Sequence, residues 1–103
     1  MKPQDRQFLR YLPPGADDPM KIAIGHRQLD LINALRRAPA TRLDLLRRGR
    51  PRIALNATAL ISQLRKKGVE IEGRWETARE IDGGRIRFMR YAIAGRVLGT
   101  SRK

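Results

Sequence analysis

The residues best suited to chemistry in this sequence are the arginines and lysines of its middle third, and the chemistry that they suit is binding to a polyanion. Residues 36–67 carry ten basic side chains and a single acid, Asp44. Residues 68–82 carry five acids against two arginines, a net charge of −3, although the whole chain has a net charge of +13. Basic residues that served only solubility would have no reason to cluster in one part of the sequence, whereas the residues of a phosphate-binding face would.

Part of this charge has a structural explanation. Three basic clusters, residues 36–37, 47–48 and 65–67, fall in the last turns of predicted helices. Cations there complement the helix dipole by roughly 0.3–1 kcal/mol each. That effect does not explain Arg42, which is in the first turn of a predicted helix, or Arg50 and Arg52, which are in a predicted turn. We therefore predict contacts with the phosphates of duplex DNA, which supply most non-specific affinity. The predicted phosphate-contacting residues are Arg42, Arg47, Arg48, Arg50, Arg52 and Asn56.

The polar side of the predicted helix 57–67 is suited to reading base edges in a major groove. The candidate base-contacting residues there are Thr58, Ser62, Gln63 and Lys66. The same pattern also fits an ordinary solvated helix face. Arg85 and Arg87 follow the predicted turn Asp82-Gly83-Gly84, where a β-hairpin wing would meet the DNA backbone or a narrow minor groove. The preceding strand is acidic, which indicates that one side of this wing faces away from DNA.

The sequence gives no pattern typical of catalysis or of a metal site. It has one histidine and no cysteine, which cannot make a zinc centre. Ser62 and Ser101 lack a general base at a suitable spacing, and the glycines form no phosphate-binding fingerprint. We predict a protein that is not an enzyme and uses no cofactor, metal or small-molecule substrate.

No apolar run is long enough for a secretory signal or a membrane span. We therefore expect a cytoplasmic, nucleoid-associated protein without a membrane partner.

Three helices must position these side chains. The first begins at His26 and stops before Pro39. The second opens with a capping box formed by Thr41 and Asp44 and ends at Gly49, and we expect it to bury Leu43 and Leu46.

The third predicted helix covers residues 57–67. Asn56 is its expected N-cap, and Leu55 and Leu60 form its hydrophobic staple. Gly68 ends it, with Val69 closing a Schellman motif.

After Gly68 the apolar period changes to two, which predicts a strand over residues 69–77. Asp82-Gly83-Gly84 is a hairpin turn, and residues 85–93 return as a second strand. Ile86 and Phe88 are out of phase with Met89, Tyr91 and Ile93, so this second strand either contains a bulge or faces two ways.

The predicted fold class is α+β, a winged helix-turn-helix with three helices followed by a two-stranded β-hairpin wing. Its expected parts are a partly extended N-terminal arm (residues 1–25), the winged helix-turn-helix domain (26–95) and a loose basic tail (96–103). The apolar side chains near residues 8–12 are the part of the arm that could dock on the domain.

The stretch from Leu29 to Ile93 also resembles the small winged helix-turn-helix domains of bacterial phage and prophage proteins. The matching segments are "ALRRAPATRLDLLRR", "ISQLRKKGVEI", "GRWET" and "RFMRYAI". The resemblance implies a small DNA-binding or regulatory module without a cofactor. The sequence departs from the family at "RGRPRIALN", where the turn before the third helix looks longer and more basic than expected.

The predicted function is binding of double-stranded DNA in transcriptional or phage-type regulation, with helix 57–67 in the major groove. One alternative is a winged-helix protein–protein interaction module that uses the acidic strand 70–82. Another is an RNA-binding or ribosomal-type protein, against which the sparse aromatic residues argue. A second copy of the chain, forming a homodimer, is a further partner left open.

Overall fold

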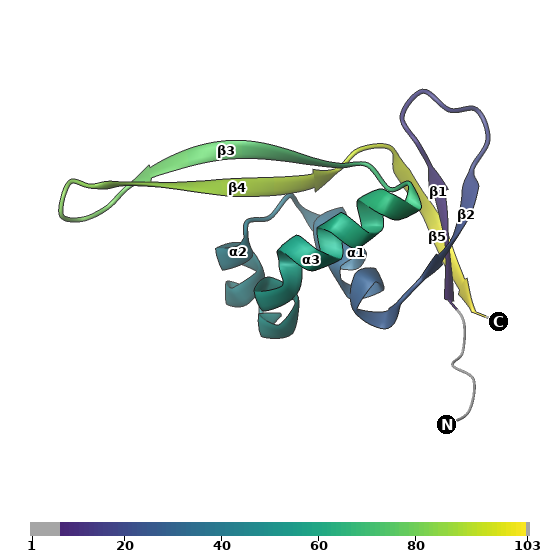
Figure 1. Cartoon of the computed structure of the whole chain (residues 1–103), viewed down its shortest axis with the longest axis horizontal. Helices are drawn as coiled ribbons and strands as arrows, with labels where there is room; N and C mark the ends of the chain where they lie inside the picture. Colours follow the sequence, from purple (N-terminus) through teal and green to yellow (C-terminus); the bar gives the residue numbers. More distant parts are fainter. Residues whose placement is uncertain (1–6, 103) are drawn as a thin grey trace.

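Three helices, a long β-hairpin and a three-stranded sheet make up the chain in the computed structural model, which describes residues 7–102 (Figure 1). In chain order the elements are β1 (Gln7–Leu12), β2 (Met20–Ile24), α1 (His26–Arg37), α2 (Arg42–Arg47), α3 (Pro51–Lys67), β3 (Ile71–Arg79), β4 (Arg85–Ile93) and β5 (Arg96–Arg102). The predicted α+β class is confirmed. None of the helices in this described part is long and apolar enough to cross a membrane.

The capping signals of α2 are confirmed, but its predicted buried face is wrong. The Asp44 N–H donates to Thr41 Oγ1 and the Thr41 N–H donates to Asp44 Oδ2, each at 3.0 Å. Leu43 and Leu46 remain 53% and 51% exposed, whereas Leu45 is fully buried. Because α2 has only six residues, fewer than two turns, it points a single side chain straight at the core.

The predicted start of the third helix is also wrong, because α3 begins six residues earlier, at Pro51. Proline is favoured at the first position of a helix, where its missing N–H costs nothing. Ile53 and Ala54 are buried and extend the apolar stripe toward the N-terminus, and a helix starting at residue 57 would leave them out. Asn56 is therefore not a cap, and its side chain donates to the Arg52 carbonyl within the helix at 2.9 Å. Leu55 is 74% exposed and forms no staple.

The end of α3 is as predicted. Gly68 has a positive φ of 107°. The Val69 N–H donates to the Leu64 carbonyl at 3.0 Å, and the Gly68 N–H donates to the Arg65 carbonyl at 3.1 Å. These two bonds define the expected Schellman motif.

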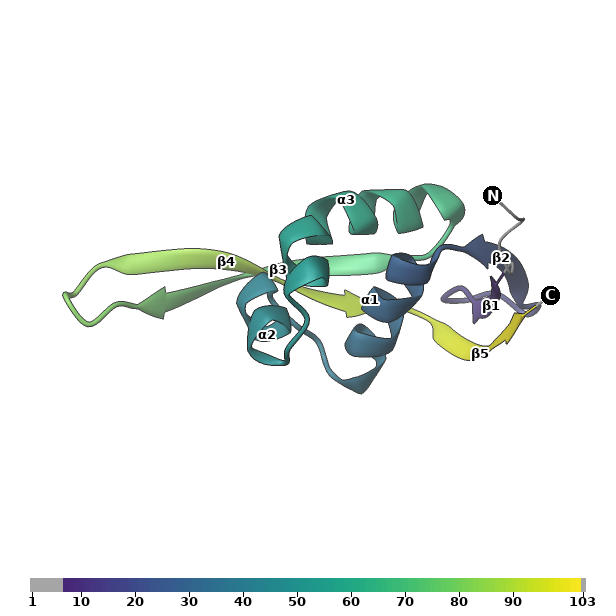
Figure 2. The ribbon, with the colours of Figure 1, turned by 90° about the horizontal axis from the view of Figure 1, so that it is seen from below.

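The hairpin β3–β4 extends well beyond the helices (Figure 2). Its register is unbroken from the Ile71–Ile93 pair to the Arg79–Arg85 pair, so β4 contains no bulge and both of its faces are partly buried near its end. The predicted turn is confirmed, with Gly83 at a φ of 92°. At the other end, Ala40 and Tyr91 exchange two backbone hydrogen bonds of 3.0 and 2.8 Å, which attach β4 to the segment between α1 and α2.

The chain ends do not form the predicted arm and loose tail. β1 lies at the centre of an antiparallel sheet, with β2 on one side and β5 on the other. Leu9 and Tyr11 alternate toward the core and are fully buried, which gives the strand one apolar face. Residues 1–6 and 103 of the predicted arm and tail lie outside the described residues.

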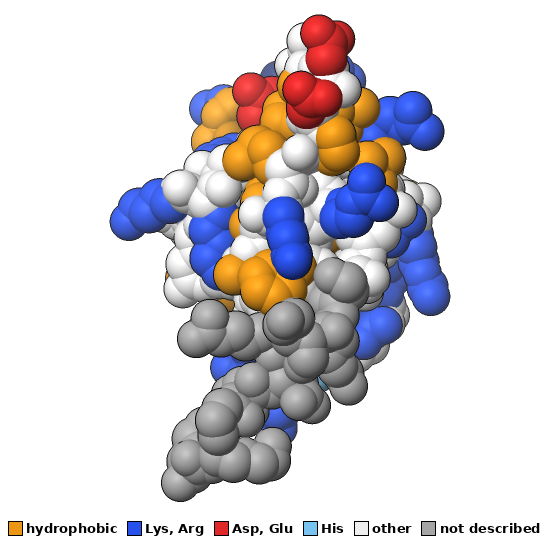
Figure 3. Space-filling model, turned by 90° about the vertical axis from the view of Figure 1, so that its right-hand side faces the viewer, with side chains coloured by type: hydrophobic (Ala, Val, Ile, Leu, Met, Phe, Trp, Pro, Cys, Tyr) orange, Lys and Arg blue, Asp and Glu red, His pale blue; other side chains and the backbone are white. Residues whose placement is uncertain are grey.

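This sheet occupies one end of the molecule. In the view of that end, acidic side chains gather at the top, and the β1–β2 loop includes the exposed Asp17 and Asp18 (Figure 3). Basic side chains are spread over the rest of the face rather than collected in one patch. This face of the molecule therefore offers no single basic surface to a polyanion.

Candidate nucleic-acid interface

The outward side of α3 is exposed and free of acids. Thr58, Ser62 and Lys66, three of the four predicted base-contacting residues, line one shallow hollow of about 350 Å³. Arg65 and Tyr91 contribute to the same hollow, which therefore lies at the edge between α3 and β4. No side-chain hydrogen bond joins Thr58, Ser62 or Lys66 to another residue within 7–102. Their polar groups are available to a ligand.

Gln63, the fourth predicted base-contacting residue, lies on the α1 side of the helix. Its Oε1 accepts a hydrogen bond of 2.8 Å from Gln28 of α1. The Gln28 Oε1 in turn accepts one from Lys67, also at 2.8 Å. Gln63 would have to give up its bond to Gln28 in order to turn its carbonyl toward a base.

The six predicted phosphate-contacting residues do not share one surface. Arg48 and Arg50 line a hollow of about 520 Å³, together with two arginines that end α1. Its full lining is Asn33, Ala34, Arg36, Arg37, Arg48 and Arg50, and we call it the basic hollow. Four guanidinium groups and no carboxylate surround it, and none of the four forms an ion pair with another described residue. This arrangement is suited to phosphate oxygens.

Arg42 and Arg47 lie elsewhere, on a groove between α2, α3 and the hairpin. The Arg42 Nε already donates to the Ala54 carbonyl at 3.1 Å. Arg52 is in the first turn of α3 rather than in a turn before it, and its side chain is exposed.

Arg36 and Arg37 were not among the predicted phosphate-contacting residues. A signal was present in the two basic clusters at the ends of successive helices, residues 36–37 and 47–50. Whether such helix ends lie side by side depends on the tertiary fold.

The two predicted wing arginines have different surroundings. The Arg87 guanidinium lies over the Trp75 ring, 4.6 Å from its centroid, a cation–π contact that leaves the charge in place. Arg85 is exposed next to the turn. The turn itself carries Glu80, Ile81 and Asp82, all exposed, so its outermost part is acidic.

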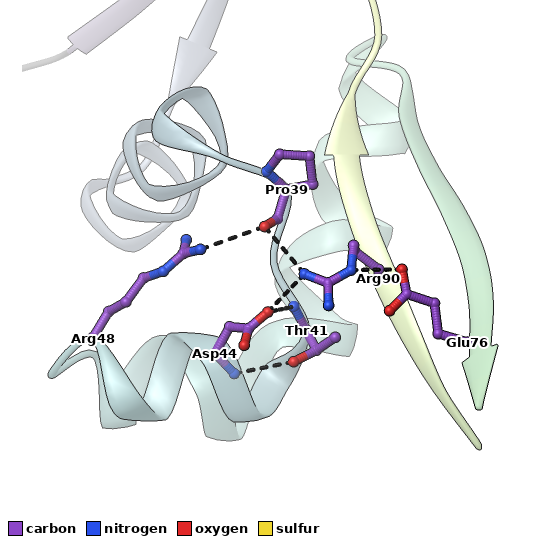
Figure 4. Close-up of polar contacts among 6 residues, drawn as sticks. All are labelled: Pro39, Thr41, Asp44, Arg48, Glu76 and Arg90. Atoms are coloured by element: carbon purple, nitrogen blue, oxygen red, sulfur yellow. Dashed lines mark hydrogen bonds and ion pairs between the residues drawn. The ribbon is translucent and has the colours of Figure 1, made fainter. Parts of the chain in front are cut away.

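Arg90, which the sequence analysis did not identify, joins the hairpin to α2 (Figure 4). Its guanidinium donates to Asp44 at 2.8 Å and to Glu76 at 2.7 Å. It also lies 3.5 Å from the Pro39 carbonyl, which Arg48 approaches from the other side at 3.4 Å. One cation from β4 thus contacts α2, β3 and the loop before α2, and it fixes the hairpin relative to the helices.

This network predicts an acid sensitivity centred on Asp44. The Thr41 N–H that donates to its carboxylate lowers the pKa of Asp44 below the ordinary value of 3.8, and the bonds to Arg90 act in the same direction while burial opposes them. A carboxylate whose pKa is lower in the folded state contributes stability that is present above about pH 4 and is lost as the pH falls through the folded value. We expect the unfolding temperature of Asp44→Asn to fall less than that of the wild type between about pH 5 and pH 2, because the amide does not titrate.

Thermal unfolding followed by circular dichroism measures this effect. Asp18→Asn, in the exposed β1–β2 loop, controls for the loss of one negative charge. If the wild type and Asp44→Asn lose stability in parallel on acidification, then the hydrogen bonds from Thr41 and Arg90 do not stabilise the ionised form of Asp44.

Among the residues that the structure describes, no cluster of histidine, cysteine or acidic side chains could hold a metal ion. Comparison with known proteins finds no matching family, no similar curated protein and no similar solved structure.

Proposed function

We propose that the chain binds double-stranded DNA through a winged helix-turn-helix and acts in transcriptional or phage-type regulation. The observation that carries the proposal is the connection between α2 and α3. α2 ends at Arg47 and α3 begins at Pro51, so only three residues join them, and the central one, Gly49, has a φ of 79°. A turn of three or four residues that contains glycine is typical of the helix-turn-helix motif. The segment "RGRPRIALN" looked long because its last part belongs to α3, although the turn itself is still basic, with Arg48 and Arg50 on either side of Gly49.

The composition of α3 supports its role as the recognition helix. All four charged residues of α3 are basic. In a helix-turn-helix, the N-terminal part of the second helix contacts base edges. Because α3 starts at Pro51, Arg52 occupies that part of the helix, and we assign it to the bases rather than to phosphates. Ser62 and Lys66 extend the same exposed side farther along the helix.

We assign the phosphate contacts to the arginines of the basic hollow. Arg50 belongs to this hollow and directly precedes α3, so the hollow lies beside the N-terminus of the proposed recognition helix. Contacts with the DNA backbone beside the major groove fix the position of such a helix along the duplex.

In this proposal the wing contacts DNA through Arg85 and Arg87 rather than through its turn. Glu80 and Asp82 would be repelled by phosphates at short range. We therefore place the strand residues beside the duplex and the acidic turn beyond it.

Two substitutions separate base contacts from phosphate contacts. Arg52→Ala should reduce discrimination between a selected duplex and a random one by about tenfold or more, because a good base contact contributes about 1–3 kcal/mol of discrimination. Arg50→Ala should weaken binding to all duplexes alike and reduce the slope of log affinity against log salt by about one. Fluorescence anisotropy with a duplex selected from a random library measures both.

Arg10→Ala is the matched control, because it removes one exposed arginine from β1, in the terminal sheet. Arg10→Ala should have a smaller effect on affinity than Arg50→Ala. Equal effects of Arg52→Ala and Arg50→Ala on all duplexes would contradict the placement of α3 in the groove. A structured RNA that competes as well as duplex DNA would favour the RNA-binding alternative.

A further inference from the structure

A groove of about 780 Å³ lies between α2, the first half of α3 and the hairpin, and its walls are largely apolar. Five of the eight large hydrophobic side chains that are exposed in the described chain line it. They are Leu43, Leu46, Leu55, Trp75 and Ile86, with exposed fractions between 47% and 74%. We call this surface the apolar groove. Contiguous exposed apolar surface of this kind is typical of an interaction site.

The charges around the apolar groove specify what fits it. Arg42, Arg47 and Arg87 contribute to its lining, and none of the three forms an ion pair with another residue in the described part of the chain. The acid in the lining, Asp44, is already bonded to Arg90. An occupant should therefore combine a large apolar side chain with carboxylates beside it.

The chain itself carries a segment with this chemistry. At the end of the hairpin, Ile81 is fully exposed, with a relative accessibility of 109%, and it lies between Glu80 and Asp82. We call residues 80–82 the hairpin tip. The tip projects far from the helices in both views of the ribbon, so it cannot fold back into the groove of its own chain without breaking the hairpin (Figures 1 and 2). A two-stranded hairpin is only marginally stable alone, so its outer half would gain from a partner.

We propose that the apolar groove binds the hairpin tip of a second copy of this chain. In the resulting dimer the two hairpins run antiparallel past each other, and each copy places Ile81 in the groove of the other. Glu80 and Asp82 then lie near the partner's arginines at the rim of the groove. Ile81 is six positions beyond Trp75 in the groove wall, a reach of about 20 Å in extended chain. The two contacts are equivalent, as a two-fold symmetric dimer requires.

Charge reversal tests this dimer in the absence of DNA, so its outcome is independent of the proposed function. One variant carries Glu80→Lys and Asp82→Lys, and the other carries Arg47→Glu and Arg87→Glu. Each variant alone sets like charges against each other, and its dimer dissociation constant in sedimentation velocity should rise about tenfold or more. An equimolar mixture restores opposite charges at both contacts and should form a dimer as stable as the wild type.

The circular dichroism spectrum and unfolding midpoint of each variant establish that it is folded. A wild type that remains monomeric at about millimolar concentration would overturn the proposal, as would two variants that dimerise like the wild type. Failure of the mixture to dimerise would also overturn it.

Disulfide trapping locates the contact, because the chain has no cysteine of its own. One copy carries Ile81→Cys and the other carries Leu55→Cys, and the mixed disulfide is identified by mass spectrometry after mild oxidation. It should form at least about tenfold faster than the mixed disulfide between Asp17→Cys and Leu55→Cys, because docking raises the effective concentration of the two thiols. Equal rates for the two pairs would show that Ile81 does not enter the groove.

Discussion

The affinity of the chain for a random DNA duplex should fall about 500-fold when the salt concentration rises from about 50 to about 200 mM. The four arginines of the basic hollow and Arg85 of the wing are five exposed cations without carboxylate partners among the described residues. If each neutralises one phosphate, the slope of log affinity against log salt is about −4.5, because each contact releases about 0.9 counterion. Fluorescence anisotropy titrations at four or more salt concentrations measure the slope.

A double variant tests where the slope originates. Arg36→Ala with Arg37→Ala removes two of the four cations of the basic hollow, so the slope should become shallower by about two. Arg10→Ala with Arg96→Ala, which removes two exposed cations from the terminal sheet, should change it less. A response that is flat in salt would contradict DNA binding and favour the protein-partner alternative.

Leu9→Ala should lower the free energy of unfolding by about 2–5 kcal/mol. Leu9 is fully buried in the hydrophobic core and belongs to β1, the central strand of the terminal sheet. Removing its side chain leaves a cavity between that sheet and the helices. Urea unfolding measured by circular dichroism or tryptophan fluorescence gives the change.

Arg10→Ala is the neighbouring control, since Arg10 points to solvent from the same strand, and it should cost less than about 1 kcal/mol. A similarly small cost for Leu9→Ala would mean that residues 7–12 are not part of the core and form an arm instead.

Signals that act over a few residues were sufficient to predict much of the helical region and the hairpin. The Thr41–Asp44 capping box, the Schellman motif at Gly68 and the turn near Gly83 each depend on neighbours within five positions. Each of these motifs supplies hydrogen-bond partners to backbone groups at the end of a helix or strand from residues nearby in the sequence. No distant part of the chain is needed to form them. The start of α3 had two competing local signals, Pro51 and Asn56, and burial of Ile53 in the core decided between them.

The terminal sheet could not be predicted in the same way. β1 pairs with β5 over about 90 positions, from Gln7–Arg102 to Leu12–Arg96. The alternation of Leu9 and Tyr11 is too short to separate a strand from an extended arm. Pro13 and Pro14 lie in the loop that turns the chain from β1 to β2, and prolines at these positions are equally typical of an extended arm.

The composition predicted that the candidate site would be basic. Which of the basic side chains lie together depends on the fold. Arg36 and Arg50 come from separate elements and share a hollow because α1 packs beside the turn before α3. Arg42 matches them in charge yet lies on the apolar groove. Arg90 is set among basic and apolar neighbours in the sequence. The register of the hairpin pairs it with Arg74 and places Glu76 diagonally across from it, and only the packing of β4 beside α2 brings it to Asp44.

The position of β1 between β2 and β5 also has a consequence during synthesis. The ribosome completes β1 and β2 early, but the second edge of β1 stays without its hydrogen-bonding partner until residues 96–102 emerge. An open strand edge is a template for pairing with other chains, so nascent or C-terminally truncated molecules are the forms most exposed to aggregation. Closure of this sheet joins distant parts of the chain and is therefore expected to be a slow and late step of folding.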